Sequence, residues 1–161
     1  MNRVLVIGCP GSGKSTLAKA LHEKTGLPLF HLDMMYWNAD KTNVDESMFL
    51  ARVSYALAQE SWIIDGNYAA SLELRMQSCD TVIFLDYSVE TCLEGIAARK
   101  GKVRTDIPWV ETEDDLEFLD FVRSYPVLVR PNVLTLLEKY ADKEIHIFRT
   151  RQDADVFLSQ I

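Results

Sequence analysis

Short apolar runs alternate with amphipathic stretches along most of the chain. Five runs rich in β-branched or aromatic residues predict buried strands, at residues 4–7, 29–32, 62–64, 81–85 and 145–148. Apolar positions that recur every three or four residues predict helices at 15–24, 45–60, 89–100, 112–123, 133–140 and 153–161. The helix at 112 is expected to open with a capping box from Thr112 to Asp115. Strands that are apolar on both faces and separated by helices predict one doubly wound α/β domain around a five-stranded parallel sheet.

Composition narrows the class of protein. The chain has 161 residues, of which 48% are hydrophobic, and a net charge of −7. The hydrophobic content excludes a disordered chain. It does not indicate a membrane span either, because no apolar run approaches the roughly 20 residues that span a bilayer. Its three cysteines are widely spaced, which indicates neither a disulfide framework nor a zinc site. The acidic balance argues against a surface for duplex DNA. We expect a cytoplasmic protein with no membrane partner and no direct DNA binding.

One segment carries most of the chemistry. The first strand ends in Gly8-Cys9-Pro10-Gly11-Ser12-Gly13-Lys14-Ser15-Thr16, which matches the phosphate-loop pattern G-x-x-x-x-G-K-[ST]. Glycines in such a loop let backbone N–H groups turn inward around an anion at a helix N-terminus. Lys14 is then expected to reach the β- and γ-phosphates of ATP, and the Ser15 hydroxyl to ligate magnesium. The residues expected to bind the cofactor ATP with Mg²⁺ are Gly8, Pro10, Gly11, Ser12, Gly13, Lys14, Ser15 and Thr16.

Acidic residues stand where other strands end, at the edge where parallel sheets bind ligands. Asp65 and Asp86 both have the form of the acid that holds magnesium in phosphate-loop enzymes, and Asp86 also fits a turn or helix cap. We favour Asp65, because the third strand is expected beside the first. Asp33 follows the second strand and fits either a general base for an acceptor hydroxyl or a polar loop residue. Tyr36 and Trp37 fit a pocket wall or a satellite hydrophobic cluster.

Basic residues gather between two predicted helices, at Arg99, Lys100, Lys102 and Arg104. A solvated charged loop explains such a run. The second interpretation is a lid that brings Arg99 and Arg104 over the transferring phosphoryl group, and the phosphate loop favours it. Arg75 fits either an acceptor anion or a surface salt bridge.

The motifs together resemble a known family. The phosphate loop, His31-Leu32-Asp33, Trp62-Ile63-Ile64-Asp65-Gly66-Asn67-Tyr68 and Ile83-Phe84-Leu85-Asp86 occur in the order seen in bacterial DNA topology modulation proteins, which are described as related to adenylate kinase. The resemblance covers nearly the whole chain. It implies a phosphate-loop fold of the nucleoside-monophosphate-kinase type, with three α/β/α layers, an acceptor-binding arm at about 33–60 and a lid at about 99–112. Adenylate kinases carry Asp-Gly-Phe-Pro-Arg where this chain has Asp65-Gly66-Asn67-Tyr68, so a smaller acceptor is favoured, as in shikimate and gluconate kinases.

These observations predict a magnesium-dependent phosphotransferase that moves the γ-phosphoryl group of ATP to a small metabolite or nucleotide. Lys14, Asp33, Arg99 and Arg104 are the predicted catalytic residues, and Ser15 and Asp65 the metal ligands. Asp33, Asp65, Asn67, Tyr68 and Arg75 are the predicted acceptor-binding residues. A monomer or homodimer is expected. Two alternatives remain: a nucleotide-binding regulator without turnover, which affects DNA topology indirectly or through a partner, and simple nucleotide hydrolysis.

Overall fold

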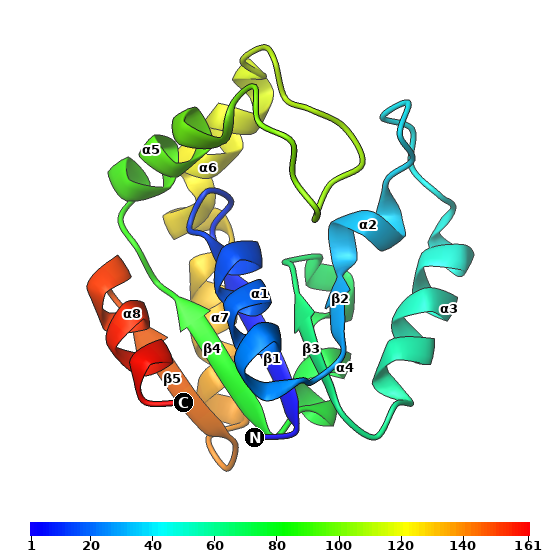
Figure 1. Cartoon of the computed structure of the whole chain (residues 1–161), viewed down its shortest axis with the longest axis vertical. Coiled ribbons are helices and arrows are strands. Elements are labelled where there is room, and N and C mark those ends of the chain that lie inside the picture. Colours follow the sequence, from blue (N-terminus) through cyan, green and yellow to red (C-terminus); the bar gives the residue numbers. More distant parts are fainter.

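The predicted sheet is present in the computed structural model, which describes residues 1–161. Five strands, all parallel, lie in the order β2-β3-β1-β4-β5 (Figure 1). They are β1 (Arg3–Gly8), β2 (Leu29–His31), β3 (Trp62–Asp65), β4 (Thr81–Leu85) and β5 (Glu144–Phe148). β1 lies in the middle and is paired on both sides, so the phosphate loop leaves the sheet at its centre.

Eight helices complete the fold. They are α1 (Lys14–Thr25), α2 (Leu32–Tyr36), α3 (Glu46–Leu57), α4 (Ala69–Ser78), α5 (Val89–Arg99), α6 (Leu116–Leu128), α7 (Arg130–Lys139) and α8 (Arg151–Ser159). Helices α1 and α8 cover one face of the sheet, while α3, α4 and α7 pack on the other. α5 and α6 lie above the ends of the central strands (Figure 1). No helix combines the length and the apolar character that crossing a bilayer requires.

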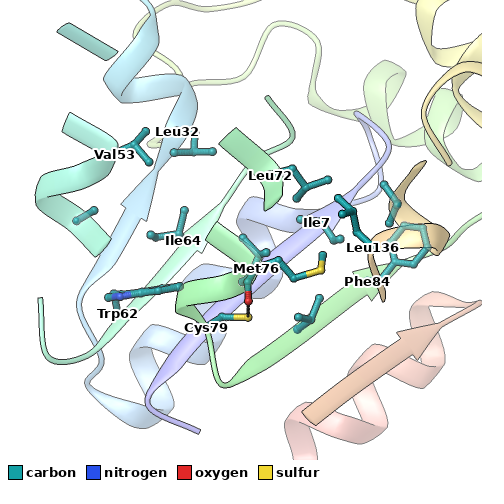
Figure 2. Packing of buried hydrophobic residues seen from close by; sticks show 14 of the residues in the cluster. Ile7, Leu32, Val53, Trp62, Ile64, Leu72, Met76, Cys79, Phe84 and Leu136 are labelled. Atoms are coloured by element: carbon teal, nitrogen blue, oxygen red, sulfur yellow. Dashed lines mark hydrogen bonds between the residues drawn. The ribbon is translucent and has the colours of Figure 1, made fainter. Parts of the chain in front are cut away.

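Alternation along the strands divides the core into two layers. Leu5, Ile7 and Trp62 point into the larger cluster, and Val4, Val6 and Ile63 point into the smaller one on the opposite face. Figure 2 shows the larger cluster, where Trp62 and Ile64 of the sheet meet Val53 of α3 and Met76 of α4. Burial on both faces explains why each strand reads as a continuous apolar run.

Four local expectations are corrected by the structure. Helix α4 was not predicted, because its buried face includes Ser71 and Arg75, which weaken the apolar periodicity. The strand expected at 29–32 ends at His31, and Leu32 begins the short helix α2. The capping box at Thr112 is wrong: α6 begins at Leu116, and the carboxylate of Asp115 accepts from the Phe118 N–H. α7 begins at Arg130, three residues earlier than expected, with a proline in its first turn.

Candidate active site

The phosphate loop joins β1 to α1 in a conformation that its glycines permit. Gly11 and Gly13 have φ values of +84° and +93°, in the left-handed region that side chains disfavour. Gly13 is the N-cap of α1 and offers no capping side chain, so the first N–H groups of that helix stay available to an anion. Gly8 and Ser12 are buried residues of the loop, and the Ser12 hydroxyl has no hydrogen-bond partner.

Gly11 also marks a close approach between the loop and α5. A Cβ at Gly11 would lie 2.0 Å from the Cys92 carbonyl oxygen, and a Cβ at Gly95 would lie 2.0 Å from the Gly11 carbonyl oxygen. Neither position therefore has room for a side chain. The absence of two Cβ atoms lets the loop and the helix backbone touch, and it makes α5 part of the wall that shapes the loop.

The loop forms one wall of a cavity of about 1440 Å³. Pro10, Gly11, Gly13, Lys14, Ser15 and Thr16 line that wall. Asp33, Asp65, Asn67 and Tyr68 line another, and the predicted lid segment, residues 99–112, contributes further lining residues. In Figure 1 the chain between α5 and α6 passes over the ends of the strands toward α2. Most of the predicted donor and acceptor residues therefore share one chamber, and the exceptions are Gly8, Ser12 and Arg75, which do not line it.

Lys14 lies between the two walls. Its ammonium group donates to the carbonyl oxygen of Cys9 at 3.3 Å. Burial lowers the pKa of Lys14, and the nearby charges of Asp65 and Asp33 act in the opposite direction. The lysine is thus held against the loop by one carbonyl and lies within electrostatic reach of two carboxylates, in a position to neutralise an incoming phosphate.

Asp33 is held from below by a tyrosine. The structure places it in the first turn of α2, where Tyr68 donates a hydrogen bond to its Oδ1 at 2.6 Å. Burial raises the pKa of Asp33, although Tyr68 and Lys14 act against that shift. Its second oxygen, Oδ2, has no protein partner. A carboxylate with a raised pKa and a free oxygen is suited to accepting a proton.

Asp65 ends β3 directly beside β1, in register with Val6. Its side chain is buried, and its Oδ1 lies 2.9 Å from Nδ1 of His31. The remaining oxygen, Oδ2, is buried without a partner. His31 is a site residue that the motif reasoning missed, since only the pairing of β2 with β3 brings it opposite Asp65.

Asp86 also follows a strand that flanks β1, so sheet order alone does not separate the two acids. Its partners do. Arg130 donates to both carboxylate oxygens at 2.8 and 2.9 Å, and Arg149 lies 3.4 Å away. It is not a helix cap either, because Ser88 caps α5. Asp86 anchors α7 and the segment after β5, and it does not line the cavity.

The lid arginines are already paired with acids of the same segment. Arg104 makes a two-pronged contact with Asp106, at 3.0 and 2.5 Å, and a further contact with Glu111. Arg99 lies 3.3 Å from Glu111. Burial opposes charge on both arginines; it lowers the pKa of Arg99, whereas the bond to Asp106 raises the pKa of Arg104. The conformation of this segment is therefore held by its own ion pairs.

Arg75 does not bind at the site, contrary to both interpretations of the sequence. It is fully buried in α4 and does not line this cavity. Its guanidinium donates to the carbonyl oxygens of Gly66, Asn67 and Tyr68 and to the hydroxyl of Ser71. Arg75 thus holds the turn after β3, which carries Asn67 and Tyr68 into the cavity wall.

Arg151 is a second residue that sequence reasoning missed. It begins α8, yet it donates to the carbonyl oxygens of Ser12 at 3.0 Å and Gly11 at 3.3 Å. Its guanidinium also lies over the ring of Tyr87, at 5.5 Å from the centroid. No motif signals this contact, because it joins positions about 140 residues apart.

The two aromatic residues after Asp33 have different roles. Tyr36 packs against Phe49 and Tyr68, in the hydrophobic layer beneath the arm. Trp37 faces the cavity and meets Trp109 of the lid edge-on, with ring centroids 5.5 Å apart. Both interpretations were therefore partly right, one for each residue.

Comparison with known proteins agrees with this geometry. A model of the ATPase family associated with various cellular activities (AAA) matches residues 4–87. No curated protein matches the chain. Among solved structures, the crystal structure of shikimate kinase from Bacteroides thetaiotaomicron aligns with a TM-score of 0.60 at 18% identity, over 99% of this chain and 95% of that one. The predicted phosphate-loop fold of the nucleoside-monophosphate-kinase type is confirmed. The narrower resemblance to DNA topology modulation proteins stays a prediction.

Proposed function

Since the chain belongs to the ATPase family associated with various cellular activities, we propose that it binds ATP in the phosphate loop and transfers the γ-phosphoryl group to a small acceptor. The observation that carries the proposal is the shared chamber. One cavity is lined both by the phosphate loop and by Asp33, a half-buried carboxylate with a free oxygen. A hydrolase needs only the first of these walls, whereas a phosphotransferase needs both.

The donor half of the cavity suits a nucleotide. Backbone N–H groups at the start of α1 and the ammonium of Lys14 face the space where the β- and γ-phosphates belong. Arg151 and the α5 backbone fix the loop from behind, so its N–H groups stay oriented before the nucleotide binds.

The residues present also fit magnesium. Asp65 keeps one buried oxygen without a partner next to the loop, and the Ser15 hydroxyl lines the same cavity. Oxygen ligands of this kind are those that Mg²⁺ prefers. Ser15 and Asp65 would hold the ion, which supplies positive charge to the donor phosphates. His31, through its bond to Asp65, fixes the orientation of that carboxylate.

The acceptor half supplies orientation and a proton acceptor. Asp33 lies where an acceptor hydroxyl can approach the γ-phosphorus, and Tyr68 holds its carboxylate in place. As the acceptor oxygen attacks, its proton passes to Asp33. The lid excludes water during this step, which favours transfer over hydrolysis.

The test is phosphoryl transfer from labelled ATP to a panel of nucleosides, nucleoside monophosphates, sugars and sugar acids. Replacing Lys14 with alanine is expected to lower the rate at least about 100-fold, because a preorganised charge at the phosphates is lost. Lys24→Ala, an exposed position in the last turn of the same helix, is the matched control. Full activity in Lys14→Ala contradicts the mechanism. Phosphate release without any acceptor favours a hydrolase, and tight ATP binding without turnover favours a regulator.

A further inference from the structure

The acceptor half of the cavity is short of cations that an anionic acceptor could use. Its walls carry three carboxylates, Asp33, Asp65 and Asp106. The charges of Asp65 and Asp106 both raise the pKa of Asp33, so the three groups lie within electrostatic reach of one another. A phosphate or carboxylate placed here would meet the like charge of Asp33 and of Asp65, whereas the charge of Asp106 is paired with Arg104.

Of the arginines near this half, only Arg99 keeps a nitrogen atom without a partner. Both prongs of Arg104 face Asp106, and its third nitrogen faces Glu111. One nitrogen of Arg99 lies 3.3 Å from Glu111, and Arg75 is bound to the backbone carbonyls of the turn after β3. An arginine fork is the group that grips a carboxylate or phosphate with two bonds. Arg104 has no nitrogen left for such a contact. The unpartnered Nε of Arg99 belongs to a guanidinium whose charge lowers the pKa of Lys14, on the side of the donor phosphates.

Two lysines remain, and neither replaces such a fork. Lys41 and Lys102 are exposed at the rim of the cavity, without an acidic partner. Lys41 lies over the ring of Trp109, at 5.9 Å from its centroid. A flexible surface ammonium gives one point charge and loses side-chain entropy when it is fixed.

Aromatic rings take the place of cations in this half. Trp37 from the arm and Trp109 from the lid meet edge-on where the two segments approach each other, and Tyr68 lies below, beside Asp33. Both tryptophans are half-buried, so part of each ring is free to contact a ligand. Flat apolar faces bind the ring of a base or the C–H face of a sugar by stacking.

We propose that the phosphoryl acceptor is a hydroxyl compound without a phosphate or carboxylate group, held against Trp37 and Trp109 with one hydroxyl at Asp33. The inference rests on the proposed phosphotransferase function and names its acceptor class. The acceptor oxygen forms a bond to the γ-phosphorus of ATP, and the bond from that phosphorus to the bridging oxygen breaks. The electron pair of the broken bond stays on ADP, and the hydroxyl proton goes to Asp33.

The experiment compares acceptors in pairs that differ in charge: adenosine with AMP, thymidine with TMP, and glucose with gluconate and glucose 6-phosphate; glucosamine supplies a cationic arm. Transfer from labelled ATP is expected to favour the member without an anionic group by at least about 100-fold in kcat/KM, because like charges brought together at a site are strongly unfavourable. Equal or faster transfer to the anionic members overturns the inference and leaves the proposed function standing.

A binding measurement separates the two proposals if nothing is phosphorylated. Quenching of tryptophan fluorescence is titrated with the same pairs, in the presence of a saturating non-hydrolysable ATP analogue that occupies the donor site. Tighter binding of the anionic members, or binding of neither class, overturns the inference whatever the turnover. Binding of the uncharged members without turnover supports it and counts against the proposed function.

A pair of variants tests the stacking contact. Trp109→Leu is expected to raise the KM of the preferred acceptor about 10-fold, as the loss of one stacked ring would. Leu116→Ala is the matched control, since Leu116 is 73% exposed just beyond the lid and lines no part of the cavity. An unchanged KM in Trp109→Leu overturns the assignment of this wall.

Discussion

Replacing Gly95 with alanine has two effects of opposite sign on the stability of the protein. Gly95 lies inside α5, where alanine is the better helix former by about 1 kcal/mol. The added Cβ, however, would lie 2.0 Å from the carbonyl oxygen of Gly11 and 3.0 Å from the guanidinium of Arg151. Real Cβ atoms do not come within 3.0 Å of such an atom, so the helix or the phosphate loop must move by about 1 Å.

The contact is expected to outweigh the propensity. Overpacking costs about 1–3 kcal/mol, and the upper part of that range applies here because a backbone carbonyl cannot rotate away. The net loss is then about 2 kcal/mol, or a fall in Tm of about 4–8 °C for a domain of this size. A shift of about 1 Å in the loop is also expected to lower kcat/KM for ATP about 100-fold.

The assay combines thermal unfolding with the kinetics of phosphoryl transfer. Ala97→Gly is the control, because Ala97 is exposed in the same helix and reports helix propensity alone. That variant should lose about 1 kcal/mol and keep its ATP kinetics. If Gly95→Ala raises the Tm, as propensity alone predicts, the close approach between α5 and the phosphate loop is refuted.

Three other predictions concern Arg75 and Asp33. Arg75→Met leaves the carbonyl oxygens of Gly66 and Tyr68 without their donor. It is therefore expected to lower the free energy of unfolding, measured by urea titration, by about 3 kcal/mol. A variant with wild-type stability and weakened acceptor binding would instead restore the anion-binding interpretation. Burial raises the pKa of Asp33 above the ordinary value of 3.8. The rate of phosphoryl transfer should therefore fall as the pH drops through that raised pKa. Asp33→Asn should abolish this limb of the pH profile along with most of the rate. The same shift means that folding favours the protonated acid, so stability attributable to Asp33 declines as pH rises through this window, and Asp33→Asn should remove that dependence in unfolding measurements at several pH values.

The sequence by itself determined the sheet and the phosphate loop. The runs at 62–64 and 82–85 are apolar on both faces, and that pattern is typical of a sheet buried between two layers of helices. The loop is equally local, because its glycines and Lys14 lie within one short motif at a helix N-terminus. The placement of the third strand beside the first followed from the same fold type and is confirmed by the sheet order.

Only the tertiary structure decided what the individual polar side chains do. His31 meets Asp65 because β2 pairs with β3, and Asp86 is removed from the site because Arg130 reaches it from α7. Nothing in the local pattern distinguishes the buried Arg75 from a surface arginine, since its partners are carbonyls of a turn. The sequence showed that the predicted lid is basic, but it did not show that Asp106 and Glu111 pair with Arg104. Strand and loop formation depend on residues close in sequence. The partner of a charged side chain depends instead on which elements the fold packs together. That partner decides whether the charge is free to bind a substrate.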